Sequence, residues 1–222
     1  MMVFQDRSDA GRRLARALGR YKNGHPVVLA LPRGGVPVAA EVAQALDAPL
    51  DLVIVRKIGV PAQPELAAGA VVDGARPIVV RNEDIIRIAG VSEREFERIC
   101  ADELAEIARR RQRYLGQRPR AEVEGRVAIV VDDGIATGAT MKAALQATRE
   151  RAPQQLVLAV PVAPPEAIGE LRPLVDDLVC LETPSLFGAI GYFYNDFRQV
   201  EDEEVISILK RFPVNKAGPG GA

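Results

Sequence analysis

The sequence has few of the residues that build disulfide frameworks or zinc sites. Its 222 residues include two cysteines, Cys100 and Cys180, and a single histidine, His25. The cysteines lie far apart in the chain and do not form a CxxC pair, and zinc sites in proteins draw their ligands from clusters of cysteine and histidine. The sequence therefore supports neither a disulfide framework nor a zinc centre.

Long apolar runs and an excess of charge of one sign are also missing. The longest aliphatic runs, Val27 to Leu31 and Val127 to Val131, fall far short of the roughly 18 apolar residues that span a bilayer. Lysine and arginine (29) nearly balance aspartate and glutamate (30), so the net charge is -1 and no overall basic field attracts nucleic acid or an anionic membrane. The N-terminal segment has no apolar signal region, and Asp6 and Asp9 argue against a transit peptide. We expect a cytoplasmic protein with no membrane contact.

The composition is that of an ordinary folded protein. Hydrophobic residues make up 48% and charged residues 27% of the chain, close to the average for globular domains. The length favours a single domain over residues 1–212. Residues 213–222, PVNKAGPGGA, carry no apolar pattern and are predicted to form a disordered tail.

Aliphatic runs of strand length alternate with segments of helical periodicity. The pattern begins with a strand at 27–31, a PRGG turn and a helix at 36–46, followed by a second strand at 50–55. This order is typical of a βαβ unit. Further strands are predicted at 126–131, 156–162 and 175–181. The alternation predicts an α/β fold with a mostly parallel sheet flanked by helices.

The segment after the second strand departs from this alternation. The stretch KIGVPAQPEL, residues 57–66, holds two prolines and a glycine and is predicted to be a loop. Residues 68–72 and 77–80, which an Asp-Gly turn joins, are predicted to form a β-hairpin.

A helical insertion is predicted at residues 82–118, where glycine and proline are scarce. A short helix precedes a long amphipathic helix that starts at the capping box formed by Ser92 and Glu95. Its apolar stripe favours a homodimer. Acidic residues gather in its first half and four arginines in its second, the distribution that a helix dipole favours. Those arginines leave nucleic-acid binding open as an alternative, although the net charge does not favour nucleic acid as a partner. They are Arg109, Arg110, Arg111 and Arg113.

The loop that follows the strand at 126–131 has the features of a phosphate site. Small residues lead directly into the start of a helix, where backbone N–H groups and the helix dipole attract anions. Gly138 allows a phosphate to approach closely. The loop lacks the lysine of a P-loop and the spacing of a dinucleotide fingerprint. The predicted phosphate-binding residues are Ala136, Thr137, Gly138, Ala139 and Thr140.

Two carboxylates, Asp132 and Asp133, stand between this strand and this loop. They are predicted to lie at the carboxyl edge of the sheet, where open α/β sheets bind their ligands. A phosphate would repel them, so their predicted targets are sugar hydroxyls, a bridging Mg²⁺ or a developing positive charge.

The hydrophobic strand, the acid pair and the sequence ATGAT together resemble the phosphoribosyl pyrophosphate (PRPP) motif of the type I phosphoribosyltransferases. The stretch LPRGGVPVAAEVA resembles the pyrophosphate-binding loop of the same family, and Arg56 and Lys57 follow the second strand. The resemblance covers most of residues 26–182. It implies the type I phosphoribosyltransferase fold and a Mg²⁺-dependent transfer from PRPP.

The resemblance also implies roles for individual residues. Residues 136–140 would bind the 5-phosphate, and Asp132 and Asp133 would bind the ribose hydroxyls and, through ribose or water, the metal. Related enzymes often have a non-proline cis peptide in the pyrophosphate loop. The backbone of that loop, at Arg33, Gly34 and Gly35, would hold the pyrophosphate. Arg56 and Lys57 would add cationic contacts to the leaving group, which completes a catalytic set of Asp132, Asp133, Arg56 and Lys57.

A cluster of aromatic residues follows the last predicted strand. Five of the ten phenylalanines and tyrosines of the chain fall within LFGAIGYFYNDF, in a segment, residues 183–200, that we call the hood. Phe187, Tyr192 and Tyr194 are predicted to stack on a nucleobase acceptor. The alternative is an aromatic mini-core that covers the end of the sheet.

These features predict a phosphoribosyltransferase that moves 5-phosphoribosyl from PRPP to a small nitrogenous acceptor, with a nucleobase favoured, and releases pyrophosphate. The alternative is a non-catalytic PRPP sensor that regulates a partner protein or RNA. A phosphatase or hydrolase that uses the two aspartates is a third interpretation, which the lack of a nucleophile and base pair disfavours.

Overall fold

The computed structural model describes residues 3–61, 63–74, 77–212 and 214. The predicted disordered tail, residues 213–222, lies outside the described residues apart from Val214.

Five parallel strands form a central sheet in the order β2-β1-β6-β7-β8. The strands are β1 (Val27–Ala30), β2 (Leu50–Leu52), β6 (Val127–Val131), β7 (Gln155–Val162) and β8 (Asp177–Glu182). Their nearly continuous aliphatic sequence follows from burial on both faces of the sheet. In β1, for example, Val28 and Ala30 pack into one apolar cluster, while Val27 and Leu29 pack into a second on the opposite face.

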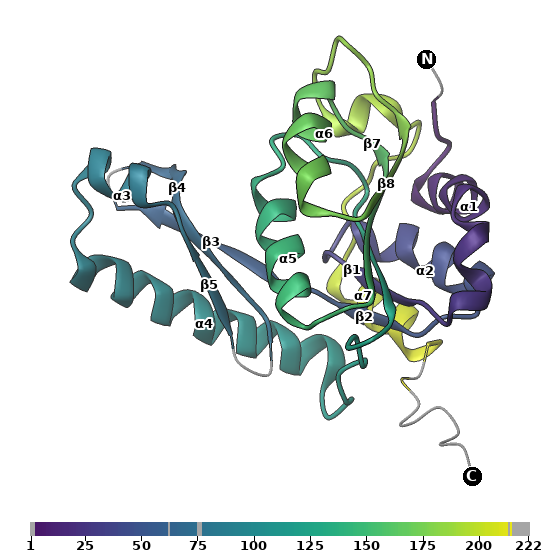
Figure 1. The fold of residues 1–222 in the computed structure, drawn as a ribbon, viewed down its shortest axis with the longest axis horizontal. Coiled ribbons are helices and arrows are strands. Elements are labelled where there is room, and N and C mark those ends of the chain that lie inside the picture. Colours follow the sequence, from purple (N-terminus) through teal and green to yellow (C-terminus); the bar gives the residue numbers. More distant parts are fainter. Residues whose placement is uncertain (1–2, 62, 75–76, 213, 215–222) are drawn as a thin grey trace.

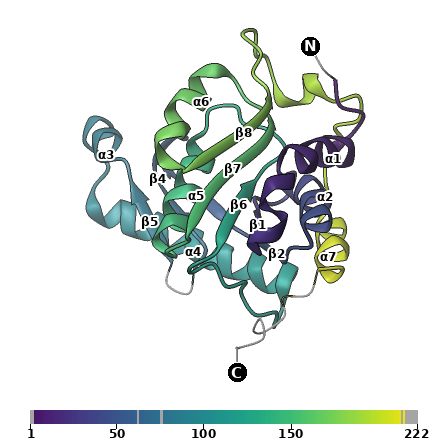
Figure 2. The ribbon, with the colours of Figure 1, turned by 45° about the vertical axis from the view of Figure 1, so that its right-hand side comes forward.

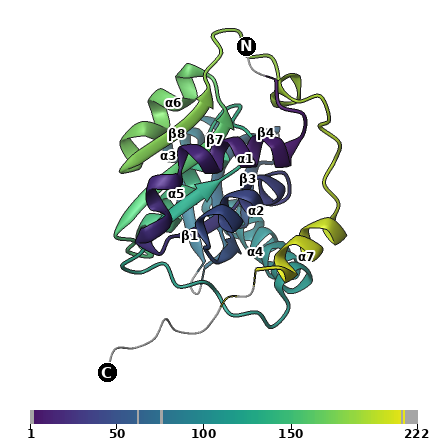
Figure 3. The ribbon, with the colours of Figure 1, turned by 90° about the vertical axis from the view of Figure 1, so that its right-hand side faces the viewer.

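Helices cover both faces of this sheet, as Figure 2 shows. The helices α1 (Arg7–Ala17) and α2 (Gly35–Leu46) cover one face, and α5 (Ala139–Glu150) and α6 (Pro165–Leu171) cover the other. The last helix, α7 (Asp202–Lys210), packs beside α2 (Figure 3). The predicted α/β architecture is confirmed. Among the described residues, no helix is long and apolar enough to cross a membrane.

A second, smaller sheet projects from this body as an arm, residues 55–115 (Figure 1). It consists of three antiparallel strands in the order β3-β4-β5, with two helices. These elements are β3 (Val55–Val60), β4 (Gln63–Val72), β5 (Ile78–Arg81), α3 (Glu83–Ala89) and α4 (Glu93–Leu115). The helices predicted as an insertion at 82–118 thus share one unit with the predicted hairpin. The capping box of Ser92 and Glu95 is present at the start of α4.

The predicted hairpin is confirmed, whereas the loop predicted at 57–66 is wrong. Most of that stretch belongs to β3 and β4, which pair with shifts in register on both sides of Gly59. Pro61 falls in the connection between the strands, and Pro64 lies in the irregular part of β4. Prolines are compatible with strands at such places because no regular ladder hydrogen bond is lost.

The long helix α4 buries its apolar stripe inside the chain. Phe96, Ile107, Tyr114 and Leu115 are buried, and α4 packs against β3 and β4. Much of the stripe is therefore used inside the chain, and the homodimer stays a prediction.

Each arginine of the run in α4 pairs with an acid of the same chain. Arg109 and Arg110 pair with Glu106, Arg111 with Asp73, and Arg113 with Asp202 and Glu203. These ion pairs explain the arginine run as part of the fold, with no need for a nucleic-acid partner.

The base of the arm is held by a buried carboxylate. Asp73, at the end of β4, accepts hydrogen bonds from Arg111 at 2.7 Å and from both terminal nitrogens of Arg120 at 2.7 and 2.6 Å. The Asp73 side chain is 5% exposed. A buried carboxylate with three charge-assisted hydrogen bonds fixes the end of β4 to α4 and to the segment that follows it.

We expect Asp73→Asn to lower the free energy of unfolding by about 3 kcal/mol, because it leaves two partly buried guanidinium groups without their counter-charge. Urea denaturation measures the change. The control is Asp102→Asn, which removes the pair of Arg98 with an acid whose side chain is 72% exposed and should have little effect. Equal unfolding free energies for the two variants would contradict this assignment.

Candidate active site

Two loops meet at the carboxyl edge of the central sheet. The PRGG loop, residues 32–35, leads from β1 into α2, and the acid pair, Asp132 and Asp133, follows β6. A Cβ atom added to Gly34 would lie 2.1 Å from Oδ2 of Asp133, and one added to Gly35 would lie 2.9 Å from the Cα of Asp132. Only residues without a side chain allow this approach. The structure thus brings together the predicted pyrophosphate loop and the predicted ribose-binding acids.

The PRGG loop has the backbone that the family resemblance implies. The peptide bond between Pro32 and Arg33 is cis. The N–H of Gly35 donates to the Leu31 carbonyl at 3.1 Å, and the N–H of Leu31 donates to the Val131 carbonyl at 3.0 Å. These bonds tie the loop to the end of β6.

Burial dominates the electrostatics of the acid pair. Asp133 is 8% exposed, whereas Asp132 keeps part of its surface open. Burial, followed by the neighbouring Asp133 charge, raises the pKa of Asp132 well above its usual range. Burial also raises the pKa of Asp133, and the ion pair with Arg7 opposes that rise. One Asp132 oxygen accepts the backbone N–H of Asp133 at 2.9 Å.

Two residues that the sequence did not single out for this purpose hold Asp133. The Nε of Arg7, the first residue of α1, donates to Oδ2 of Asp133 at 2.7 Å. The hydroxyl of Tyr194 donates to the Asp133 carbonyl at 2.6 Å, and burial raises the pKa of this tyrosine, so the hydroxyl keeps its proton. No local signal marks Arg7, because it lies 126 positions from its partner.

The predicted phosphate loop forms the start of α5. Gly138 is the N-cap residue of this helix and has a φ of +79°, in the left-handed region that glycine adopts without strain. Its neighbours are exposed: Ala136, Thr137, Ala139 and Thr140. The first backbone N–H groups of a helix have no partner inside the helix. They and the two hydroxyls form a surface suited to an anion.

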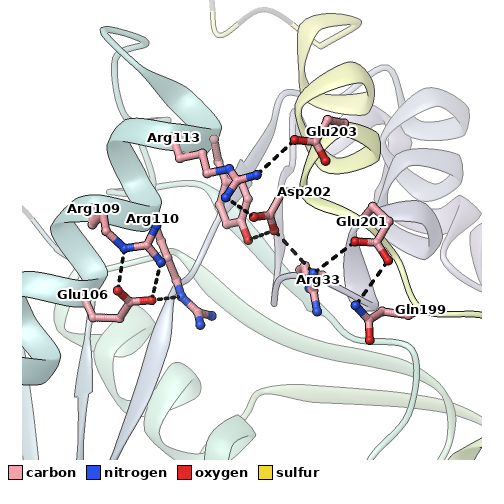
Figure 4. Close-up of polar contacts among 10 residues, drawn as sticks. Arg33, Glu106, Arg109, Arg110, Arg113, Gln199, Glu201, Asp202 and Glu203 are labelled. Carbon is pink, nitrogen blue, oxygen red and sulfur yellow. Dashed lines mark hydrogen bonds and ion pairs between the residues drawn. The ribbon is translucent and has the colours of Figure 1, made fainter.

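The Arg33 side chain turns toward α7. Its Nη1 lies 3.6 Å from Asp202 and 3.9 Å from Glu201. Asp202 also accepts a hydrogen bond from Tyr114 at 2.6 Å and pairs with Arg113 at 2.8 Å, and Figure 4 shows this cluster between α4 and the start of α7. The Arg33 backbone, which carries the predicted role, remains in the PRGG loop.

Arg56 and Lys57 lie on β3, in the arm. The Nε of Arg56 donates to Glu103 of α4 at 2.6 Å. Both residues line a cavity of about 420 Å³ together with Ile99, Glu103 and the end of β3. Among the described contacts, the ion pair of Arg56 is with α4 and not with the acid pair or the phosphate loop, so its role toward a leaving group stays a prediction.

The hood forms an aromatic cluster with the N-terminal segment. Phe193 and Tyr194 are buried together with Phe4. Phe187 stacks on Phe193 with ring centroids 5.4 Å apart. Phe193 and Tyr194 therefore belong to an aromatic mini-core, as the alternative interpretation of the hood predicted. Tyr192 is 73% exposed and lies over Gly188, so Tyr192 and the half-buried Phe187 remain available to an acceptor.

The donor set of the acid pair fits a magnesium ion that is held partly by substrate. Mg²⁺ prefers one or two carboxylates together with substrate phosphate oxygens and water. No group of three or more metal-ligating side chains is found among the residues that the structure describes. Asp132, partly open and next to the phosphate loop, suits this mode of binding.

Comparison with known proteins agrees with this geometry. The family described as "Phosphoribosyl transferase domain" matches residues 5–197. The chain belongs to this family. The match extends from the segment before Arg7 to the aromatic hood and includes both loops of the site.

Three relatives match nearly the whole length of this chain. "Putative phosphoribosyl transferase Rv0571c" of Mycobacterium tuberculosis H37Rv is 47% identical over 212 residues, which are 95% of this chain and 47% of that protein. The corresponding protein of strain CDC 1551, MT0597, matches equally. The chain thus spans about half the length of the curated relatives it matches. The crystal structure of TT1426 from Thermus thermophilus is 43% identical, with a TM-score of 0.83, and covers 96% of this chain and 100% of that one.

We expect Gly34→Ala to destabilise the protein by about 1–3 kcal/mol, because the added methyl group would overlap the Asp133 carboxylate and force the loops apart. The matched control is Gly169→Ala in α6, where an added Cβ meets nothing within 4 Å and the helix should gain stability. Urea unfolding midpoints measure both. An unchanged midpoint for Gly34→Ala would show that the two loops are not in contact.

Proposed function

We propose that the protein transfers 5-phosphoribosyl from PRPP to a nitrogenous acceptor, with a nucleobase as the favoured class, and releases pyrophosphate. The observation that carries this proposal is the meeting of the PRGG loop, the acid pair and the start of α5 at one edge of the sheet. Family membership supports the transferase class.

Each part of PRPP has a place in this arrangement. The 5-phosphate binds to the phosphate loop, residues 136–140, at the start of α5. The ribose hydroxyls bind to Asp132 and Asp133. The pyrophosphate lies against the backbone of Arg33, Gly34 and Gly35, the loop that the two glycines allow to approach the acid pair. Arg56 and Lys57 supply further positive charge to the leaving group.

The reaction follows from where charge develops. As the bond from C1 to pyrophosphate breaks, C1 becomes positive and the leaving oxygens become more negative. The carboxylates stabilise the ring, and the backbone N–H groups and cations stabilise the leaving group. The acceptor nitrogen then forms the new bond at C1. When bound, Mg²⁺ supplies additional positive charge to the pyrophosphate oxygens, and Asp132 and Asp133 would hold it through ribose or water.

The hood supplies the acceptor side of the site. Phe187 and Tyr192 offer aromatic faces for a base to stack on. Tyr194, predicted to share this role, is buried in the aromatic cluster, and its contribution in this proposal is to hold the Asp133 backbone.

A homodimer and a cytoplasmic location stay predictions.

Calorimetric titration tests PRPP binding. We expect wild type to bind PRPP in the presence of Mg²⁺ and to lose at least about tenfold in affinity when EDTA replaces the metal, because the pyrophosphate charge is then unscreened. Asp132→Asn should weaken binding by about tenfold or more, since it removes a charge-assisted acceptor of the ribose hydroxyls. Glu170→Gln, on the exposed surface of α6, should bind as wild type does. No binding by the folded wild type would overturn the proposal.

Pyrophosphate release separates the transferase from the sensor. A panel of purine and pyrimidine bases is incubated with PRPP, Mg²⁺ and enzyme, and pyrophosphate is measured with and without each base. Base-dependent release supports transfer. Binding of PRPP with no release for any base would exclude these bases as acceptors and favour the sensor.

We expect Tyr192→Ala to raise the KM for the accepted base about tenfold and to leave PRPP affinity unchanged, because a stacking surface is worth about 1–1.5 kcal/mol. Leu186→Ala, which truncates another exposed hood residue (91% exposed), is the control. An unchanged KM in Tyr192→Ala would remove Tyr192 from the acceptor site.

A further inference from the structure

Arg7 reaches the acid pair from outside the central sheet. It is the first residue of α1, and the Asp6 carboxylate caps that helix. The N-terminal segment before it is fixed to the hood: the N–H of Phe4 donates to the Phe193 carbonyl at 2.8 Å, and the N–H of Asn195 donates back to the Phe4 carbonyl at 2.8 Å. The backbone of Arg7 therefore lies close to the place where the N-terminal segment is hydrogen-bonded to the hood.

The guanidinium of Arg7 makes three contacts at once. Nε donates to Oδ2 of Asp133 at 2.7 Å, and Nη1 donates to the Arg198 carbonyl at 2.7 Å. The guanidinium carbon lies 3.9 Å from the centre of the Phe197 ring. Two hydrogen bonds in different directions and a ring contact leave this planar group a single orientation.

That orientation sets the Asp133 carboxylate. The carboxylate is confined between Arg7 and the backbone at Gly34. Oδ2 is engaged by Arg7, whereas Oδ1 accepts no hydrogen bond from any other residue that the structure describes. With one oxygen fixed, the direction of the other is fixed too, so the entropy of orienting the carboxylate is already lost before substrate binds.

We propose that Arg7 is a positioning residue of the phosphoribosyl site: it holds Asp133 in the orientation that binds ribose and joins the hood to the same carboxylate. This inference rests on the proposed function. It predicts that a change at Arg7 weakens PRPP binding mainly through Asp133, although Arg7 does not itself touch the substrate.

A double-mutant cycle on PRPP binding with Mg²⁺, measured by calorimetry, tests this dependence. We expect Arg7→Met and Asp133→Asn each to weaken binding by about tenfold, and the double variant to be about as weak as either one, because the two residues act as a unit. Combined with Asp132→Asn, at a residue that has no direct contact with Arg7, the effect of Arg7→Met should come closer to multiplying. Multiplication in the first cycle would overturn the proposal.

Two further variants separate positioning from stability. Arg13→Met is the matched control: Arg13 also lies on α1, pairs with Asp9 at 2.7 Å and stands 5.3 Å from the Phe4 ring, but it does not contact the acid pair. It should lower the thermal midpoint and leave PRPP affinity unchanged. Arg7→Lys keeps a cation for Asp133 but loses the bond to Arg198 and the planar contact with Phe197 that orient it, so it should recover only part of the affinity lost in Arg7→Met and should not recover the thermal midpoint.

The outcomes distinguish the two proposals. A folded wild type that does not bind PRPP overturns the proposed function and the role of Arg7 with it. A wild type that binds PRPP, with Arg7→Met binding equally well, overturns the role of Arg7 alone. Affinity that follows the thermal midpoint across Arg7→Met, Arg7→Lys and Arg13→Met would show that Arg7 is only structural.

Discussion

The close approach of the PRGG loop to the acid pair is the constraint around which this molecule is organised. Because β1 and β6 are neighbours in the sheet, the loops that follow them lie side by side. Their contact requires glycine at positions 34 and 35 and buries the carboxylate of Asp133. A buried carboxylate requires a partner, which Arg7 provides. The first helix and the hood are thereby drawn to the same edge of the sheet.

The central sheet and the phosphate loop could be predicted from the sequence because their signals are local. A strand buried on both faces is a continuous aliphatic run, and the phosphate loop is a short string of small residues between a strand and a helix. The arm was harder to predict. From their sequence neighbours alone, Pro61 and Pro64 predict a loop. They are compatible with strands only because β3 and β4 pair irregularly at this place.

The site residues also divide into those with a local sequence signal and those without one. The backbone of residues 33–35 and the acid pair are marked by their own neighbours in the sequence. The roles of side chains such as Arg7, Arg56 and Arg33 depend on partners far along the chain: Asp133, Glu103 and Asp202. The near-zero net charge gives no hint of these pairs, because they cancel within the chain. A local pattern can show that an arginine is present, but it does not show which way the guanidinium turns.

The helix α4 connects the arm to the surroundings of the PRGG loop. Its 23 residues make a rod about 35 Å long, which packs on the strands of the arm and, at its C-terminal end, contacts α7 through Tyr114 and Asp202. Asp202 is also the acid beside Arg33 of the PRGG loop. The arm and the PRGG loop therefore share one partner, Asp202, and a shift of the C-terminal end of α4 would change the surroundings of Arg33.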